Sequence, residues 1–302
     1  MTHLSMRFTH ALPLLTLMLA SSQSFAQILP ENSLWLEDSQ DRLANMTEQQ
    51  FADLSKVVLD FYAPLAKIHG GELTVVNNWK DPTVNAYAEQ EGNLWTVQMF
   101  GGLARRKEIT LDGFQLVVCH EVGHHLGGFP MEADVWFADE GQADYFATET
   151  CAKGIWGNDL EVNATFRATA PELVRTSCDR AYATEAEQNL CYRSSVGGLS
   201  LANLLAALGY SGAPAFEKPD PKIVTATNHE HPKAQCRLDT YFNGALCDNM
   251  LDLQKEIPGK ETPEGGDSLE AEKQSQASSC YTYSKDAFAS RPRCWFAPRV
   301  GI

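Results

Sequence analysis

The pentapeptide His120-Glu121-Val122-Gly123-His124 is the strongest chemical signal in the sequence. Residues four apart lie on one face of a helix, so His120 and His124 can bind one metal ion together. Neutral imidazole is a ligand that suits zinc, and Glu121 can act as a general base on a water molecule at that ion. The alternative is a helix whose two histidines bind nothing.

A catalytic zinc site needs a third protein ligand and keeps one position open. Glu140 and Asp144 lie four residues apart, on one face of a second predicted helix. We predict Glu140 as the third ligand and Asp144 as the acceptor of a hydrogen bond from a ligand histidine. An acidic face directed to solvent is the alternative, and three carboxylates of the same segment compete for the role: Glu132, Asp134 and Asp139.

A third candidate group lies far downstream, in the segment from His231 to Arg237. His231 precedes a helix that Pro232 is suited to begin, and its imidazole can donate a hydrogen bond to an oxyanion. Arg237 can hold a carboxylate in place. His229 is a nearby rival, and an ordinary surface segment is the alternative. His125 points roughly 100° away from its neighbour His124 on the helix, so we do not assign it to the metal.

Hydrophobic periodicity predicts the elements that position these residues. Helices are predicted at 47–68, 110–126, 136–152, 201–208 and from 232, and strands at 73–76, 84–88 and 94–99. The last two strands pair as a hairpin, because Gly92-Asn93 favours a tight turn.

The N-terminus resembles a secretory signal peptide over residues 1–26. Arg7 precedes an apolar run at 11–20, and the small residue Ala26 suits a cleavage site. A buried N-terminal helix is the alternative. No later stretch is as long as the run of about 18 apolar residues that a membrane span needs. We therefore expect export to the periplasm or the cell exterior. The net charge of −15 argues against nucleic acid and against anionic membrane surfaces.

All eight cysteines follow Ala26, and an even number in an exported chain predicts disulfide bonds. Spacing does not fix their pairing. The nearest-neighbour hypothesis joins Cys119–Cys151, Cys178–Cys191, Cys236–Cys247 and Cys280–Cys294. Composition divides the rest of the chain into a main domain at 27–254, a polar flexible linker or surface loop at 255–279, and a cysteine-containing tail at 280–302.

His-Glu-x-x-His followed by Glu-x-x-x-Asp resembles the gluzincin metallopeptidases, and among them the HtpX and CAAX-prenyl-protease family. Three further features resemble that family: Asn85-Ala86-Tyr87-Ala88 before an alternating segment at 95–99, Gly102-Leu103, and the His-Pro-x-x-x-x-Arg segment at 231–237. The resemblance covers roughly residues 70–240.

This resemblance implies one Zn²⁺ ion bound by His120, His124 and Glu140, with Glu121 as the general base. It also implies that the strand near 94–99 binds an extended peptide by β-augmentation. The fold expected is α+β and zincin-like: a small mixed sheet, an active-site helix with His-Glu-x-x-His, a second helix with Glu-x-x-x-Asp, and a largely helical C-terminal half.

The function expected is that of a zinc metalloendopeptidase that acts on extended or unfolded polypeptides, with Glu121 and His231 as catalytic residues. A secreted binding or chaperone-like module with a structural or vestigial zinc site is the alternative. A further possibility is that the C-terminal tail covers the cleft, so that its removal at Lys255 raises activity.

Overall fold

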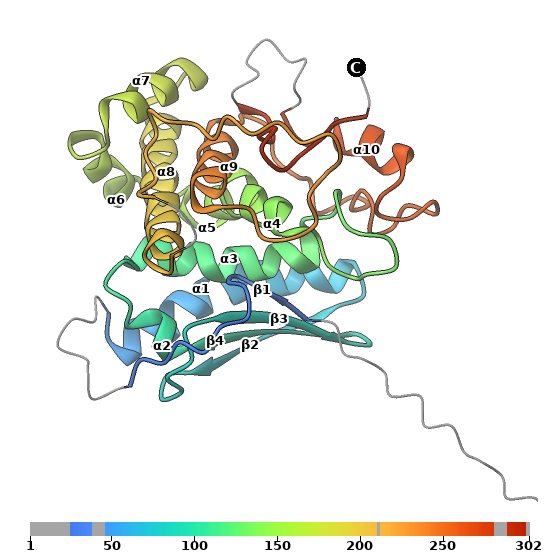
Figure 1. Ribbon diagram of the computed structural model, residues 1–302, viewed down its shortest axis with the longest axis horizontal. Coiled ribbons are helices and arrows are strands. Elements are labelled where there is room, and N and C mark those ends of the chain that lie inside the picture. Colours follow the sequence, from blue (N-terminus) through green and yellow to red (C-terminus); the bar gives the residue numbers. More distant parts are fainter. Residues whose placement is uncertain (1–24, 38–45, 210–211, 281–288, 300–302) are drawn as a thin grey trace, which may run out of the picture.

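The structure is a computed structural model that describes residues 25–37, 46–209, 212–280 and 289–299. It confirms an α+β fold with a small mixed sheet, which lies below a mainly helical C-terminal half (Figure 1). The strands are β1 (Phe25–Gln27), β2 (Glu72–Asn78), β3 (Ala86–Glu91) and β4 (Leu94–Phe100). Their order is β1-β3-β4-β2; β2 and β4 are parallel, and the other neighbours are antiparallel.

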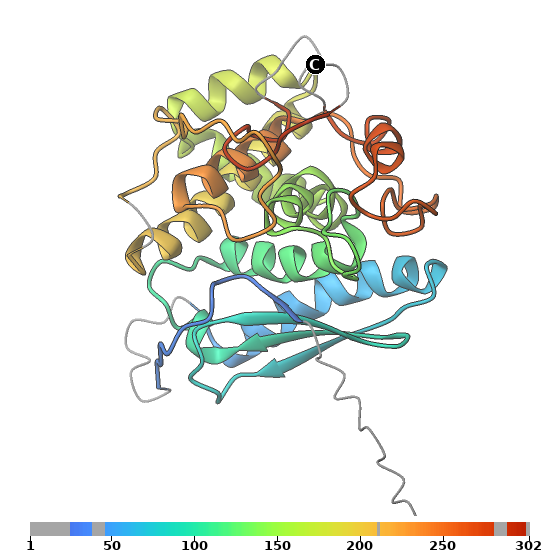
Figure 2. The same ribbon diagram turned by 45° about the vertical axis from the view of Figure 1, so that its right-hand side comes forward.

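Two long helices cover one face of this sheet. They are α1 (Glu48–Ile68) and α3 (Leu111–Leu126), and α3 lies between the sheet and the C-terminal helices (Figures 1 and 2). Thr47 and Thr110 cap them by accepting hydrogen bonds from backbone amides of the first turn, which is why both begin close to their predicted starts. α3 is buried along almost its whole length, so a polar side chain on it needs a partner.

The strand at 94–99 is not available for peptide binding by β-augmentation. β4 pairs with β2 on one side and β3 on the other, so both of its hydrogen-bonding edges are used. Side chains of Trp95, Val97 and Met99 alternate into the core, as expected for an inner strand. The edge of the sheet at the predicted site is β1, which pairs with β3.

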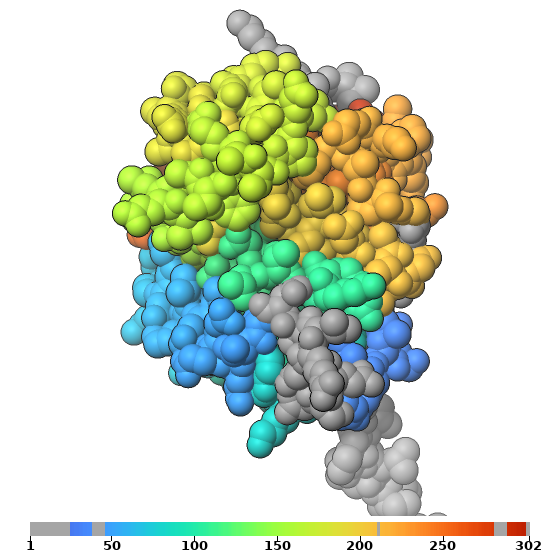
Figure 3. All heavy atoms as spheres, turned by 90° about the vertical axis from the view of Figure 1, so that its left-hand side faces the viewer, coloured from blue at the N-terminus to red at the C-terminus, as the bar shows by residue number. Residues whose placement is uncertain are grey.

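The C-terminal half contains most of the helices. Two of them, α6 (Leu160–Thr165) and α7 (Glu172–Ala181), form the yellow-green upper part of the molecule in Figure 3, above the sheet-bearing half. After the short α2 (Gly101–Ala104) and α3, the helices are α4 (Glu140–Phe146), α5 (Ala152–Trp156), α6 (Leu160–Thr165), α7 (Glu172–Ala181), α8 (Glu185–Ala207), α9 (Ala234–Leu246) and α10 (Leu269–Ser275). A π-helix, η2 (Ala147–Cys151), joins α4 to α5, and a 3-10 turn, η3 (Phe166–Ala168), follows α6.

Two predicted helices have different bounds in the structure. The helix expected at 136–152 begins only at Glu140, because the preceding residues form a loop that brings the Ala138 amide back to His124. The helix expected at 201–208 is the last part of α8, which starts at a capping box formed by Thr184 and Glu187.

The segment 255–279 is not a free linker. Ile257 and Ala271 are completely buried, and α10 forms within the segment with Ser268 as its cap. The few apolar residues of this polar stretch are therefore sufficient to fix it to the protein.

The described part of the C-terminal tail, residues 289–299, packs beside α4 and α9. Trp295 is fully buried, lies against Gly141 and donates a hydrogen bond to Thr240. The cavity at the predicted site is lined by other parts of the chain, and none of residues 289–299 borders it. The described tail therefore packs against α4, the helix that bears Glu140, and does not cover the cavity.

Four disulfides join the eight cysteines. The predicted pairs Cys119–Cys151 and Cys178–Cys191 are confirmed, whereas the other two predicted pairs are wrong: the structure has Cys236–Cys294 and Cys247–Cys280. The tail returns to α9 and so meets cysteines distant in sequence. Four disulfides fit an exported protein.

The predicted signal peptide lies outside the described residues up to position 24. Its last two residues, Phe25 and Ala26, belong to β1, so the predicted cleavage point falls inside this strand. Within the described residues, no helix combines the length and the apolar character needed to cross a bilayer.

Candidate metal centre

The structure brings the three predicted metal ligands together. His120 and His124 project from α3, and Glu140 stands at the start of α4; one donor atom of each lies within 4.8 Å of the others. The two Nε2 atoms are 3.1 Å apart, and the Glu140 carboxylate oxygens lie 3.3 Å from Nε2 of His120 and 3.5 Å from Nε2 of His124. This group could hold a metal ion.

Hydrogen bonds outside the group fix the orientation of both rings. Nδ1 of His120 lies 2.8 Å from Oδ1 of Asp144, and Nδ1 of His124 lies 2.8 Å from the carbonyl oxygen of Ala138. These oxygens accept, so each Nδ1 carries a proton, and in the neutral form of each ring Nε2 has the lone pair. Such bonds orient ligand histidines and increase their basicity.

The donor set fits a divalent cation. Two imidazole lone pairs and a carboxylate point at one volume, and Oε2 of Glu140 has no hydrogen-bond partner within the described residues. Burial lowers the pKa of His124 to about 4, so this ring is neutral, as a ligand must be. Burial alone would lower the pKa of His120 too, but Asp144 and Glu140 raise it to about 9. A cation would replace the proton that His120 holds between these carboxylates.

Glu121 is fully buried beside this group. Neither of its carboxylate oxygens has a hydrogen-bond partner in the part of the chain that is described. The pKa of Glu121 is raised to about 8, mainly by burial and also by the charge of Glu140, whereas His120 and Arg237 act in the opposite direction. A buried carboxyl group without partners is costly for a fold, which indicates that it serves a purpose other than stability.

Arg237 from α9 holds Asp144 in place. Its guanidinium donates two hydrogen bonds of 2.6 Å to the two oxygens of Asp144, and the Tyr241 hydroxyl donates a third. All three side chains are buried. The predicted role of Arg237, to hold a carboxylate, therefore matches its contacts. Tyr241 was missed, although its spacing of four residues from Arg237 places both on one face of α9.

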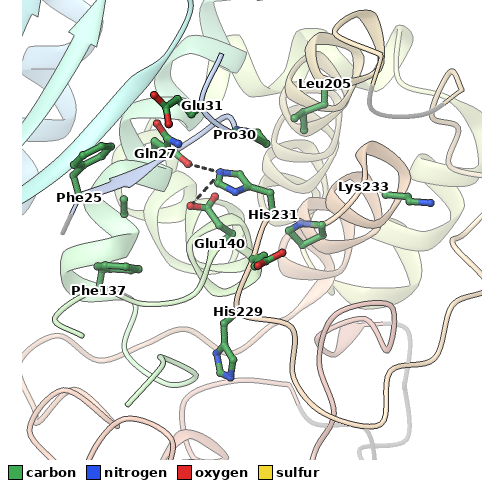
Figure 4. A pocket seen from close by; sticks show the side chains of 13 residues that line it. Phe25, Gln27, Pro30, Glu31, Phe137, Glu140, Leu205, His229, His231 and Lys233 are labelled. Atoms are coloured by element: carbon green, nitrogen blue, oxygen red, sulfur yellow. Dashed lines mark hydrogen bonds and ion pairs between the residues drawn. The ribbon is translucent and has the colours of Figure 1, made fainter. Parts of the chain in front are cut away.

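His231 lies at the rim of the metal group. Its Nε2 atom is 3.5 Å from Oε1 of Glu140 and 2.8 Å from the carbonyl oxygen of Gln27 (Figure 4). The rival His229 instead pairs with Asp139 at 2.9 Å. Both histidines, together with Gln27 and Glu140, border a cavity of about 490 Å³. His231 is thus the histidine placed to contact a carbonyl group at the metal group.

The remaining sequence candidates take no part in the group. His125 is stacked between the rings of Trp95 and Trp136, with ring centroids at 5.3 and 4.8 Å. Glu132 and Asp134 are exposed and lie outside the donor set.

Asn85, which was not predicted as a site residue, is buried and binds the backbone of Leu29 through both ends of its side-chain amide. The only signal for Asn85 was its place in the segment that resembles the HtpX family.

Comparison with protein-family models, with curated proteins and with solved structures gave no match. The function of the protein is therefore inferred from the residues of the site.

Proposed function

We propose that the protein is a zinc-dependent metalloendopeptidase of the gluzincin type, with a zincin-like fold, which acts on extended polypeptide in an exported compartment. One observation carries the proposal: a His120, His124 and Glu140 group lies beside a buried Glu121 that has no hydrogen-bond partner among the described residues. Three protein ligands leave a coordination position open, whereas a structural zinc site is closed by four. This counts against the alternative of a binding module with a structural zinc site.

His120, His124 and Glu140 would hold the ion, which supplies Lewis-acid chemistry to a carbonyl group and to water when bound. Glu121 accepts the proton of the attacking water and passes it to the leaving amine. The imidazole of His231 donates a hydrogen bond to the scissile carbonyl oxygen as this oxygen gains negative charge. Asp144, fixed by Arg237, keeps the His120 ring in the orientation that binding requires.

The test uses the variant Glu121→Gln, which keeps the size of the side chain and removes its basicity. We expect it to bind one zinc ion per chain, as the natural protein does, and to hydrolyse a generic unfolded protein at least about 100-fold more slowly. The control is Glu132→Gln, at an exposed carboxylate of the same region, which should leave activity unchanged.

Retained hydrolysis by Glu121→Gln would reject Glu121 as the base. The alternative of a binding module would be favoured by two results together: the natural protein hydrolyses nothing, and its bound zinc is not reached by a hydroxamate.

A further inference from the structure

The segment Phe25–Leu29 of this chain lies across the metal group as an added strand. β1 pairs antiparallel with the edge of β3, with Gln27 opposite Tyr87, and the Ile28 amide continues the ladder with a hydrogen bond of 3.3 Å to Ala86. This is the geometry in which an extended peptide binds to a sheet edge. The occupant of this edge is therefore the protein's own N-terminal segment.

The backbone of this segment is bound by residues of the site. Nε2 of His231 is 2.8 Å from the carbonyl oxygen of Gln27, and the Arg237 guanidinium donates to the carbonyl oxygen of Ile28. The Asn85 side chain accepts from the amide of Leu29 and donates to its carbonyl oxygen, both at 3.2 Å. Successive carbonyl groups are thus held by different side chains, which fixes the register of the segment along the site.

Side-chain burial fixes the same register. Ile28 and Leu29 are 1% and 0% exposed, whereas Phe25, upstream of them, is 51% exposed. The Gln27 carbonyl lies beside the metal group, because the His231 nitrogen that contacts it is 3.5 Å from Glu140. The Arg237 guanidinium, which donates to the Ile28 carbonyl oxygen, lies 3.4 Å from Nδ1 of His120. The Gln27–Ile28 bond therefore lies between the oxyanion donor His231 and Arg237, which contacts the ligand histidine that directly precedes Glu121 in the sequence.

We propose that Gln27–Ile28 is a self-cleavage site, hydrolysed by the metal centre of the same chain; this inference rests on the proposed function. One water molecule is consumed: its oxygen bonds to the carbonyl carbon of Gln27, and the bond from this carbon to the Ile28 nitrogen breaks. Glu121 transfers the water proton to that nitrogen. The products are a carboxylate at Gln27 and a new amino terminus at Ile28, which Ile28 and Leu29 keep anchored in the core.

The experiment uses the full chain from Met1, made by cell-free synthesis without export machinery, oxidised, and kept in a chelator. Zinc is then added, and the chain ends are read by mass spectrometry. We expect cleavage between Gln27 and Ile28, at least about 100-fold slower in Glu121→Gln and absent while the chelator is in excess. The predicted signal cleavage after Ala26 gives a chain one glutamine longer, so mass separates the two events.

A second measurement does not depend on hydrolysis. In metal-free Glu121→Gln, hydrogen exchange at the amides of Ile28 and Leu29 should be slow. Asn85→Ala should speed exchange at Leu29 at least about 10-fold, because it removes both side-chain contacts to this residue. The control Asn93→Ala, in the exposed β3–β4 turn, should not. Fast exchange at both amides in the Glu121→Gln parent would overturn the docking of the segment.

A chain that hydrolyses a generic unfolded protein with zinc but keeps Gln27–Ile28 intact, or is cut at another bond, overturns this inference alone. A chain that cuts neither substrate overturns the proposed function as well.

Discussion

Oδ1 of Asp144 lies 2.8 Å from Nδ1 of His120, and both residues are completely buried. Asp144 also receives the paired hydrogen bonds of Arg237, so one carboxylate connects a helix of the C-terminal half to the imidazole of α3. Because Nδ1 is occupied in this way, Nε2 of His120 is the atom that faces Glu140. The orientation of a predicted ligand thus depends on α9, more than 100 residues downstream of α3.

Asp144→Asn should weaken zinc binding about 10–100-fold, since it removes the charge that increases the basicity of His120. Competition against a chromophoric chelator measures the affinity. Asp134→Asn, at an exposed carboxylate outside the donor group, is the matched control, and its zinc affinity should equal that of the natural protein. Equal affinities of the two variants would show that Asp144 does not support the ligand.

Neighbouring histidines of α3 should respond differently to the same substitution. His125→Phe should keep one zinc per chain, because a phenyl ring can occupy the stack between Trp95 and Trp136. His124→Phe should bring the zinc content close to zero, since it removes one of three ligands. Elemental analysis after dialysis measures both. Loss of zinc in His125→Phe alone would mean that the ligand assignment on α3 is wrong.

Gly141→Ala should destabilise the protein by about 1–3 kcal/mol, which is the usual cost of overpacking. A Cβ atom at this position would lie 2.3 Å from the ring of Trp295, which is itself fully buried. Urea unfolding measures the free energy of unfolding. Gly212→Ala is the control, because a Cβ atom there meets no atom within 4 Å, and it should change stability by no more than about 0.5 kcal/mol. Similar values for both variants would contradict the packing of the tail against α4.

The disulfide between α9 and the tail should contribute more to stability than the local one. Chain-entropy arguments give about 4 kcal/mol for Cys236–Cys294, which spans 58 residues, and about 3 kcal/mol for Cys178–Cys191, which spans 13. Double serine variants of each pair, compared by urea unfolding, measure the difference. Peptide mapping without reduction tests the pairing itself, and a peptide that links Cys236 to Cys247 would refute it.

Local signals in the sequence were sufficient to predict the residues at the centre of the site. α3 was predictable because a threonine cap precedes it and because two histidines on one face are rare without a purpose. The shared orientation of Glu140 and Asp144 was predictable, because a spacing of four residues places both on one helical face. The hairpin of β3 and β4 was predictable from its turn residues.

Contacts between distant segments were not predictable. Gln27 and His231 are 204 residues apart, and nothing in either segment indicates that they meet. Two disulfide pairs were predicted wrongly for the same reason, because the position of the tail depends on packing around Trp295 and not on the spacing of the cysteines. The polar composition of 255–279 predicts a flexible linker or surface loop, yet Ile257 and Ala271 are buried and Glu261 contacts His69, far away in the sequence.

Cys119 directly precedes His120, and its partner Cys151 ends the π-helix that continues α4. One covalent bond therefore ties the backbone that bears the imidazoles to the backbone that bears the carboxylate. This bond limits how far the two backbones can separate in the metal-free chain, so an ion bound by these ligands would spend less free energy on gathering them.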